Sequence, residues 1–123
     1  MTTSKSILIV ILPILIPVIL YYKMSSSNKQ LITIDFEVFG KVQGVFFRKH
    51  TAQQAERLKI TGWCMNTSSG TVKGQLEGTP RSMEDMKVWL QKTGSPSSKI
   101  EKAEFSNEKT VTKPQFTHFK IRR

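Results

Sequence analysis

Two hydrophobic periods alternate along the chain, and their order constrains the fold more than any other feature of the sequence. Residues 32–39 place apolar side chains at every second position, which is typical of a strand with one buried face. Residues 46–59 change to a helical period, with Ala52, Ala55 and Leu58 on one side and polar residues on the other. A strand followed directly by a helix predicts the first half of a β-α-β unit.

The later segments continue this alternation. Val72 and Leu76 face inward in an expected strand that returns along the preceding one after a turn. Thr79 and Pro80 suit the start of a second helix, because the hydroxyl can cap it and proline can occupy its first position. The expected elements are strand 32–39, helix 46–59, strand 63–67, strand 71–78, helix 80–93, strand 100–107 and strand 117–122. This order, β-α-β-β-α-β plus a final strand, predicts an α+β fold of the ferredoxin-like (split βαβ) type, an antiparallel sheet with two helices on one face.

Residues 1–30 have a different character from the rest of the chain. Ile7–Tyr22 is a run of 16 residues without a charge, interrupted only by Pro13 and Pro17. As a helix it would reach roughly 24 Å, against roughly 30 Å for the hydrocarbon core of a bilayer. Three interpretations of this segment stay open. It could be an uncleaved membrane anchor, which is favoured, a cleaved signal, or a segment that is neither. We expect a hydrophobic leader with a polar tether at 1–30 and a folded domain at 31–123.

The net charge of +10 favours an anionic partner, and one class of anion can be set aside. A sheet domain that binds RNA by base stacking would need the K/R-G-F/Y-G/A-F-V-x-F/Y strand motif. The chain lacks this motif, and its lysines are dispersed along the sequence. We therefore expect no nucleic-acid partner.

Other reactive side chains are expected to be structural. Cys64 is the only cysteine, which excludes an internal disulfide, and we expect it in the core. His50 and His118 have no partner ligands at metal spacing, so we expect no metal. We expect three carboxylates on the solvent face of the sheet, Asp35, Glu37 and Glu77. One of them could form a hydrogen bond with Arg48.

The loop at residues 39–48 joins the first strand to the first helix and contains Gly40 and Gly44. Backbone N–H groups in such a loop can converge on an anion, and the N-terminus of the helix adds a partial positive charge. Arg48 stands in the first helical turn, where its guanidinium can donate two parallel hydrogen bonds to a phosphate. The GxxxxGK[ST] spacing of a nucleotide-binding P-loop is absent. Taken alone, the loop is compatible with a phosphate site and with an ordinary strand–helix connection.

Several short motifs resemble the acylphosphatase family, and the likeness is near to the common type of enzyme in animals. They extend from about Leu31 to the C-terminus, whereas residues 1–30 lie outside them. The motifs are Gly40–Arg48 (GKVQGVFFR), Gly62-Trp63, Asn66-Thr67, Gly70–Val72, Gly74, Gly94–Pro96 and Phe105–Lys109. The resemblance implies a ferredoxin-like hydrolase that cleaves acyl phosphates, the mixed anhydrides of a carboxylate and phosphate, without a metal or cofactor.

The resemblance also implies a role for individual residues. Arg48 would bind the phosphoryl group, Asn66 would position the attacking water, and the backbone of residues 40–48 would form a phosphate cradle. The implied substrate-binding residues are Gly40, Val42, Gln43, Gly44, Val45, Phe46, Phe47 and Thr67. Together they predict in-line attack of water on small-molecule acyl phosphates, with inorganic phosphate as product and competitive inhibitor.

Two alternatives stay open. A non-catalytic module of the same fold, tethered to a membrane, could hold phosphate or acidic partners without turning them over. Residues 66–68 (NTS) form an N-glycosylation sequon, so a functional Asn66 predicts a membrane-anchored domain that faces the cytosol, with a cytoplasmic protein as the alternative. A monomer is the default for a domain of this size.

Overall fold

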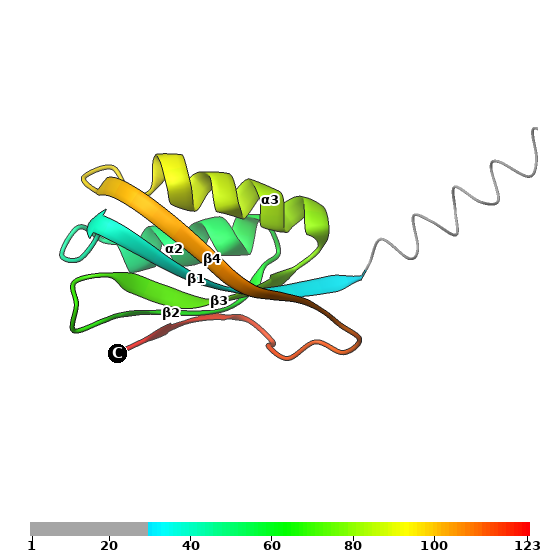
Figure 1. The fold of residues 1–123 in the computed structure, drawn as a ribbon. Coiled ribbons are helices and arrows are strands. Elements are labelled where there is room, and N and C mark those ends of the chain that lie inside the picture. Colours follow the sequence, from blue (N-terminus) through cyan, green and yellow to red (C-terminus); the bar gives the residue numbers. More distant parts are fainter. Residues whose placement is uncertain (1–29) are drawn as a thin grey trace, which may run out of the picture.

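The computed structural model describes residues 30–123, and the apolar run at residues 7–22, predicted as a membrane anchor, lies outside this range. Within the described residues, no helix combines the length and the apolar character needed to cross a membrane. Residues 30–123 form one sheet that is covered on one side by helices (Figure 1).

Five strands form this sheet in the order β4-β1-β3-β2-β5. They are β1 (Leu31–Lys41), β2 (Thr61–Asn66), β3 (Val72–Gly78), β4 (Lys99–Val111) and β5 (Phe119–Arg122). Neighbouring strands are antiparallel except β2 and β5, which run parallel. The connector 112–118 leaves β4 at the end of the sheet where β2 begins, so β5 runs in the direction of β2. The α+β ferredoxin-like prediction is confirmed, while the expectation of an antiparallel sheet is corrected at the β5 edge.

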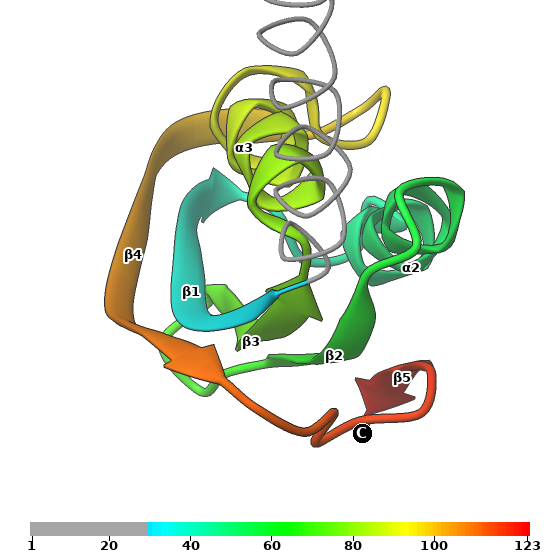
Figure 2. The same cartoon turned by 90° about the vertical axis from the view of Figure 1, so that its right-hand side faces the viewer.

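Both helices lie on the concave face of the sheet (Figure 2). The helical elements are α2 (Phe47–Arg57), α3 (Pro80–Val88) and a π-helical turn, η1 (Trp89–Thr93), that continues α3. Thr79 caps α3 as predicted, because its hydroxyl accepts a hydrogen bond from the Ser82 N–H at 3.4 Å. Since α2 connects β1 to β2 and α3 connects β3 to β4, the chain has the split βαβ arrangement.

The core fills the space between the sheet and the helices. Ile34, Phe36 and Val38 of β1 are buried there, which confirms the alternation predicted from the sequence. Val72 and Leu76 of β3 are fully buried beside them, as expected. Burial of these apolar side chains is the main favourable contribution to folding.

The buried stripe of α2 differs from the predicted one. Phe47, Thr51 and Ala55 are buried at a spacing of four residues, whereas Ala52 and Leu58 are only half-buried. The Thr51 hydroxyl donates a hydrogen bond to the Phe47 carbonyl at 2.7 Å, so this polar residue is satisfied inside the helix. Because threonine counts as polar in a hydrophobic pattern, the predicted stripe contains Ala52 where the structure buries Thr51.

A ladder of side chains crosses the open face of the sheet, with one residue from each strand in the order of the sheet. Asn107 and Gln75 each donate a hydrogen bond to the Asp35 carboxylate at 2.8 Å. The Trp63 indole N–H donates to the side-chain oxygen Oε1 of Gln75 at 2.9 Å, and the Arg122 guanidinium lies 4.0 Å from the centre of the Trp63 ring. This cross-sheet ladder ties the five strands together by side chains as well as by backbone hydrogen bonds.

Glu77 is only 2% exposed, so the prediction that it faces solvent is wrong. Its carboxylate accepts hydrogen bonds from the backbone N–H of Gln115, at 2.9 and 3.0 Å, and from that of Phe116, at 3.2 Å. Both donors belong to the connector 112–118. The alternation along β3 indicates which face Glu77 occupies, but it contains no information about the distant segment that covers that face.

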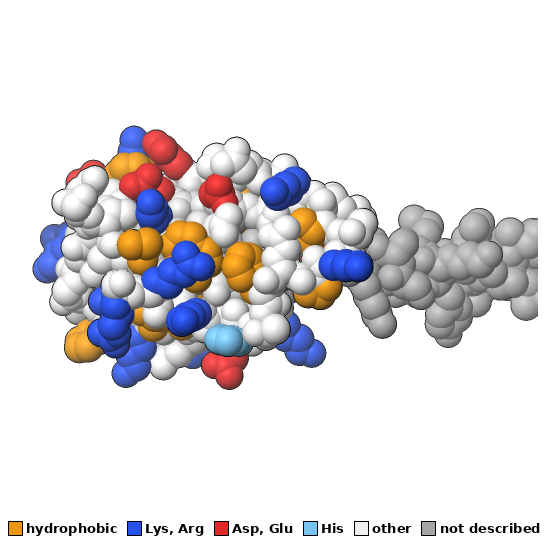
Figure 3. Space-filling view, turned by 90° about the horizontal axis from the view of Figure 1, so that it is seen from below, with side chains coloured by type: hydrophobic (Ala, Val, Ile, Leu, Met, Phe, Trp, Pro, Cys, Tyr) orange, Lys and Arg blue, Asp and Glu red, His pale blue; other side chains and the backbone are white. Residues whose placement is uncertain are grey.

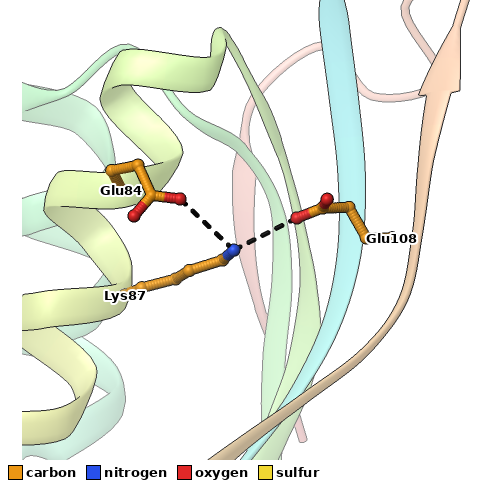
Figure 4. Close-up of polar contacts among 3 residues, drawn as sticks. All are labelled: Glu84, Lys87 and Glu108. Carbon is orange, nitrogen blue, oxygen red and sulfur yellow. Dashed lines mark hydrogen bonds and ion pairs between the residues drawn. The ribbon is translucent and has the colours of Figure 1, made fainter.

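An ion-pair cluster joins α3 to β4 (Figure 4). Lys87 Nζ lies 3.5 Å from Glu84 Oε1 on the same helix and 3.1 Å from Glu108 Oε1 on β4. Partial burial disfavours the charged ammonium, but the hydrogen bond and attraction of Glu108, together with those of Glu84, outweigh it and raise the pKa of Lys87. The cluster holds the long strand β4 against α3.

Candidate active site

A pocket of about 470 Å³ opens where β1, β2 and β5 end. This is the left-hand end of the molecule in Figure 1, where the C-terminus also lies. The loop after β1, the first turn of α2, the end of β2 and the C-terminal residues form its wall. The lining residues are Val42, Gly44, Phe46, Phe47, Arg48, Lys49, Asn66, Ile121 and Arg123.

The loop between β1 and α2 has backbone N–H groups without an acceptor among residues 30–123, and two of its residues, Gly44 and Phe46, line this pocket. Gly44 has a φ of 74°, and Phe46 has a φ of 59° and a ψ of 26° immediately before the helix. The N–H groups of residues 43–46 donate to no acceptor within residues 30–123. Successive free N–H groups around a left-handed residue, next to a helix N-terminus, form an anion-binding arrangement.

Arg48 lies in the first turn of α2 and lines the pocket. Its Nη1 atom donates to the Arg122 carbonyl oxygen at 3.4 Å, which holds the guanidinium beside β5. No carboxylate within residues 30–123 forms an ion pair with it, so the expectation that a sheet carboxylate would hold Arg48 is wrong. Glu37 accepts a hydrogen bond from Thr71 at 2.6 Å instead. The positive charge of Arg48 is therefore available to an anion.

Asn66 is the last residue of β2 and pairs with Val72 in the adjacent strand. Its Oδ1 atom is buried, yet it has no hydrogen-bond partner within the described part of the chain. An unsatisfied buried acceptor of this kind destabilises a protein by about 1–3 kcal/mol. Asn66 lines the same pocket as Arg48, and its half-buried carboxamide carries both a donor and an acceptor for a water or a substrate group.

Gln43 and Thr67 connect the loop to the β2–β3 hairpin rather than lining the pocket. The Gln43 Nε2 atom donates to the carbonyl oxygens of Thr67 and Thr71, both at 2.9 Å. The two threonine hydroxyls are 2.6 Å apart, and that of Thr71 also donates to Glu37 on β1. This network fixes the backbone beside Asn66.

Some of the predicted site residues have a structural role in strand pairing or in the core. Gly40 lies in β1 with a φ of 125°, and a Cβ there would collide with the Lys99 carbonyl oxygen of β4. Gly40 therefore permits close strand pairing and does not line the pocket. The side chains of Val42, Val45 and Phe47 are buried in the core, so these residues can offer mainly backbone groups to a ligand.

Cys64 is fully buried in β2, and its Sγ atom lies 4.0 Å from the Arg48 carbonyl oxygen. Burial raises the pKa of its thiol to about 12, and the positive charge of Arg48 offsets this only in part. The thiol is protonated at neutral pH, so the prediction of a core residue rather than a nucleophile is confirmed. Among residues 30–123, His, Cys, Asp and Glu side chains form no group of three that could hold a metal ion.

Three of the lining residues, Lys49, Ile121 and Arg123, are not among the site residues predicted from the sequence. Lys49 could have been inferred from its place beside Arg48 in the first helical turn. Ile121 and Arg123 reach the pocket because β5 pairs with β2, and no local signal in the sequence indicates that pairing. Figure 3 shows that Lys and Arg side chains gather toward this end of the face seen from below.

The fold and the site define a class of protein. It is a small α+β sandwich in which one pocket is lined by Asn66, by an arginine that has no carboxylate partner among residues 30–123, and by a loop whose backbone N–H groups have no acceptor among those residues. These are the groups needed to bind and polarise a phosphoryl group.

Comparisons with known proteins identify the family. A family model for acylphosphatases matches residues 34–121. Acylphosphatase-2 from Bos taurus is 48% identical over 97 residues, covering 79% of this chain and 98% of its own, and Acylphosphatase-1 from Homo sapiens is 50% identical over 96 residues, covering 78% and 97%. The solved structure of an acylphosphatase from Coxiella burnetii, 32% identical, superimposes with a TM-score of 0.68 over 77% of this chain and 96% of that one. The chain therefore belongs to the acylphosphatase family, and the predicted class of enzyme, a hydrolase of acyl phosphates, is confirmed.

Proposed function

We propose that the pocket is the active site and that Arg48 and Asn66 are its catalytic residues. Arg48 and the N–H groups of residues 43–46 hold the phosphoryl group, and Asn66 positions the attacking water. The observation that carries this assignment is that Asn66 and Arg48, which has no carboxylate partner among residues 30–123, line the same pocket. Thr67 and Gln43 act as positioning residues through the hairpin network.

In the proposed reaction, water attacks phosphorus in line with the bond to the acyl oxygen. A bond forms between phosphorus and the water oxygen, and the bond between phosphorus and the acyl oxygen breaks, its electron pair leaving with the carboxylate. One proton stays on the attacking oxygen and the other passes to a phosphoryl oxygen, so the products are a carboxylate and dihydrogen phosphate. Asn66 accepts a hydrogen bond from the water through Oδ1 and donates one to the phosphoryl group through Nδ2. Because a carboxylate leaves readily, positioning and charge neutralisation supply most of the rate.

Hydrolysis of benzoyl phosphate by the full chain in water labelled with heavy oxygen tests this mechanism. We expect the label in inorganic phosphate and none in benzoate, and no phosphoenzyme on rapid quenching. Label in benzoate would show attack at the carbonyl carbon, and a trapped phosphoenzyme would show a protein nucleophile. The non-catalytic alternative predicts binding of inorganic phosphate without any turnover.

We also propose that residues 31–123 form the catalytic domain and that residues 1–30 anchor it at the cytosolic side of a membrane. Support comes from the uncharged run Ile7–Tyr22 and from the sequon at 66–68, since a sugar would occupy the Asn66 nitrogen that the mechanism uses. Carbonate extraction and protease protection of the full chain with a C-terminal tag test this location. Release by carbonate would favour the cytoplasmic alternative, and protection inside vesicles would contradict the cytosolic side.

A monomer is proposed as the working state, because a domain of this size has a core of its own and can fold alone. Light scattering of the purified full chain in a mild detergent, during turnover of benzoyl phosphate, tests this. Activity confined to a dimer fraction would contradict it.

A further inference from the structure

Phe46 is the most exposed of the large apolar side chains within residues 30–123, with 73% of its surface accessible. Exposed apolar residues are common on proteins, and exposure alone says little. The place of Phe46 is more specific, because it lines the pocket that contains Arg48 and Asn66.

The backbone at Phe46 favours other types of residue. Its φ of 59° and ψ of 26° are left-handed, a conformation that glycine and asparagine adopt readily and aromatic residues seldom adopt. The ring does not belong to the hydrophobic core, so packing does not account for it either. The anion-binding loop accounts for the left-handed backbone at this position. It does not account for the presence of a phenyl side chain there.

The lining of the pocket is partly polar and partly apolar. Arg48, Lys49, Asn66 and Arg123 contribute polar or charged side chains, and Phe46 and Ile121 contribute apolar ones. Lys49 Nζ lies 6.0 Å from the centre of the Phe46 ring, which favours one orientation of that ring. An acyl phosphate whose phosphoryl group is held at Arg48 has its acyl group in the remaining space of the pocket. There the side chains of Phe46 and Ile121 offer apolar surface to an apolar acyl group.

We propose that Phe46 and Ile121 form an acyl wall that selects acyl phosphates with an aromatic or bulky apolar acyl group over acetyl phosphate. The inference rests on the proposed function, since it assumes that the phosphoryl group binds at Arg48. A phenyl group placed against the Phe46 ring removes apolar surface of both from water. A methyl group removes much less, so the acyl wall contributes little to the binding of acetyl phosphate.

Steady-state kinetics of the full chain with benzoyl phosphate and acetyl phosphate test the acyl wall, and the readout is the ratio of the two kcat/KM values. Phe46→Asn removes the ring and retains a residue that adopts the left-handed backbone. We expect this change to lower the benzoyl-to-acetyl ratio about tenfold, the effect of about 1.4 kcal/mol. Phe46→Leu should lower it less, since a bulky apolar group remains. Val88→Asn is the matched control, because Val88 is 51% exposed on α3 and does not line the pocket, and its ratio should equal that of the wild type.

The possible outcomes separate this inference from the function on which it rests. If Phe46→Asn leaves the benzoyl-to-acetyl ratio of kcat/KM unchanged, whether both values fall equally or neither falls, the acyl wall is overturned. Phe46 then has only its backbone role. A wild-type chain that hydrolyses neither substrate contradicts the proposed function itself.

Discussion

The cross-sheet ladder and the pocket at the end of β1 both contain polar side chains, but the two regions satisfy hydrogen bonds differently. Along the ladder, from Asn107 to Arg122, each side chain has its partner on the next strand. In the pocket, the Asn66 Oδ1 atom has no partner within residues 30–123, and Arg48 bonds only to a carbonyl oxygen among those residues.

This difference separates groups that stabilise the fold from groups that are kept for a ligand. A satisfied network contributes to stability and needs nothing from outside the protein. A buried acceptor without a partner lowers the stability of the free protein, and such strain is typical of functional sites. We therefore expect substitutions in the pocket to change catalysis and substitutions in the ladder to change the free energy of unfolding.

The largest expected effect is that of Arg48→Ala on catalysis. Loss of the guanidinium should lower kcat/KM for benzoyl phosphate by about 10³-fold or more and remove inhibition by inorganic phosphate. The free energy of unfolding, measured in urea, should change by less than about 0.5 kcal/mol, because the side chain is only half-buried. Arg57→Ala, at the exposed end of the same helix, should leave activity unchanged. An Arg48→Ala protein that fails to fold would erase the contrast between pocket and ladder.

Asn66→Ala should lower kcat by about 10²-fold. The inhibition constant of inorganic phosphate should stay within about twofold of the wild type, because Asn66 acts on the water rather than on ground-state binding. Asn107→Ala is the matched control in the ladder, and it should reduce stability while kcat stays unchanged. Equal losses of turnover and phosphate binding in Asn66→Ala would refute the division of labour between Asn66 and Arg48.

Gln75→Ala interrupts the ladder at its centre. The change leaves the Trp63 N–H and one oxygen of Asp35 without their partner, so we expect a loss of about 1–2 kcal/mol in the free energy of unfolding. Urea titration measures this loss, and kcat for benzoyl phosphate should match the wild type. A reduced kcat with unchanged stability would place the ladder in the catalytic machinery.

The smallest expected effect concerns Lys87, whose pKa is raised in the folded protein. Its interaction with Glu108 therefore stabilises the fold fully below the ordinary lysine pKa of 10.5, and this stabilisation is lost as the pH rises through the folded pKa. Lys87→Met keeps the apolar stem and should reduce stability by about 0.5 kcal/mol at pH 8, since such exposed pairs contribute little. The difference from wild type should disappear in strongly alkaline solution. A difference that persists there would assign the effect to packing rather than charge.

Local signals predict a large part of the fold. The alternation in residues 32–39 and the Thr79-Pro80 pair predict β1 and the start of α3, because each signal depends on neighbouring residues only. The glycine loop before Arg48 indicates an anion site for the same reason. The buried stripe of α2 is less predictable, since Thr51 satisfies its hydroxyl inside the helix and behaves as a core residue.

By itself, the sequence determined the order of the elements, the buried faces of β1 and β3 and, through its motifs, the family. Only the tertiary structure decided that β5 pairs parallel with β2, that Ile121 and Arg123 reach the pocket, and that a distant connector buries Glu77. The reason is that a hydrophobic period distinguishes the two faces of an element but does not specify what covers each face. That choice depends on contacts between residues far apart in the chain, and the same contacts bury the Asn66 Oδ1 atom without a hydrogen-bond partner among residues 30–123.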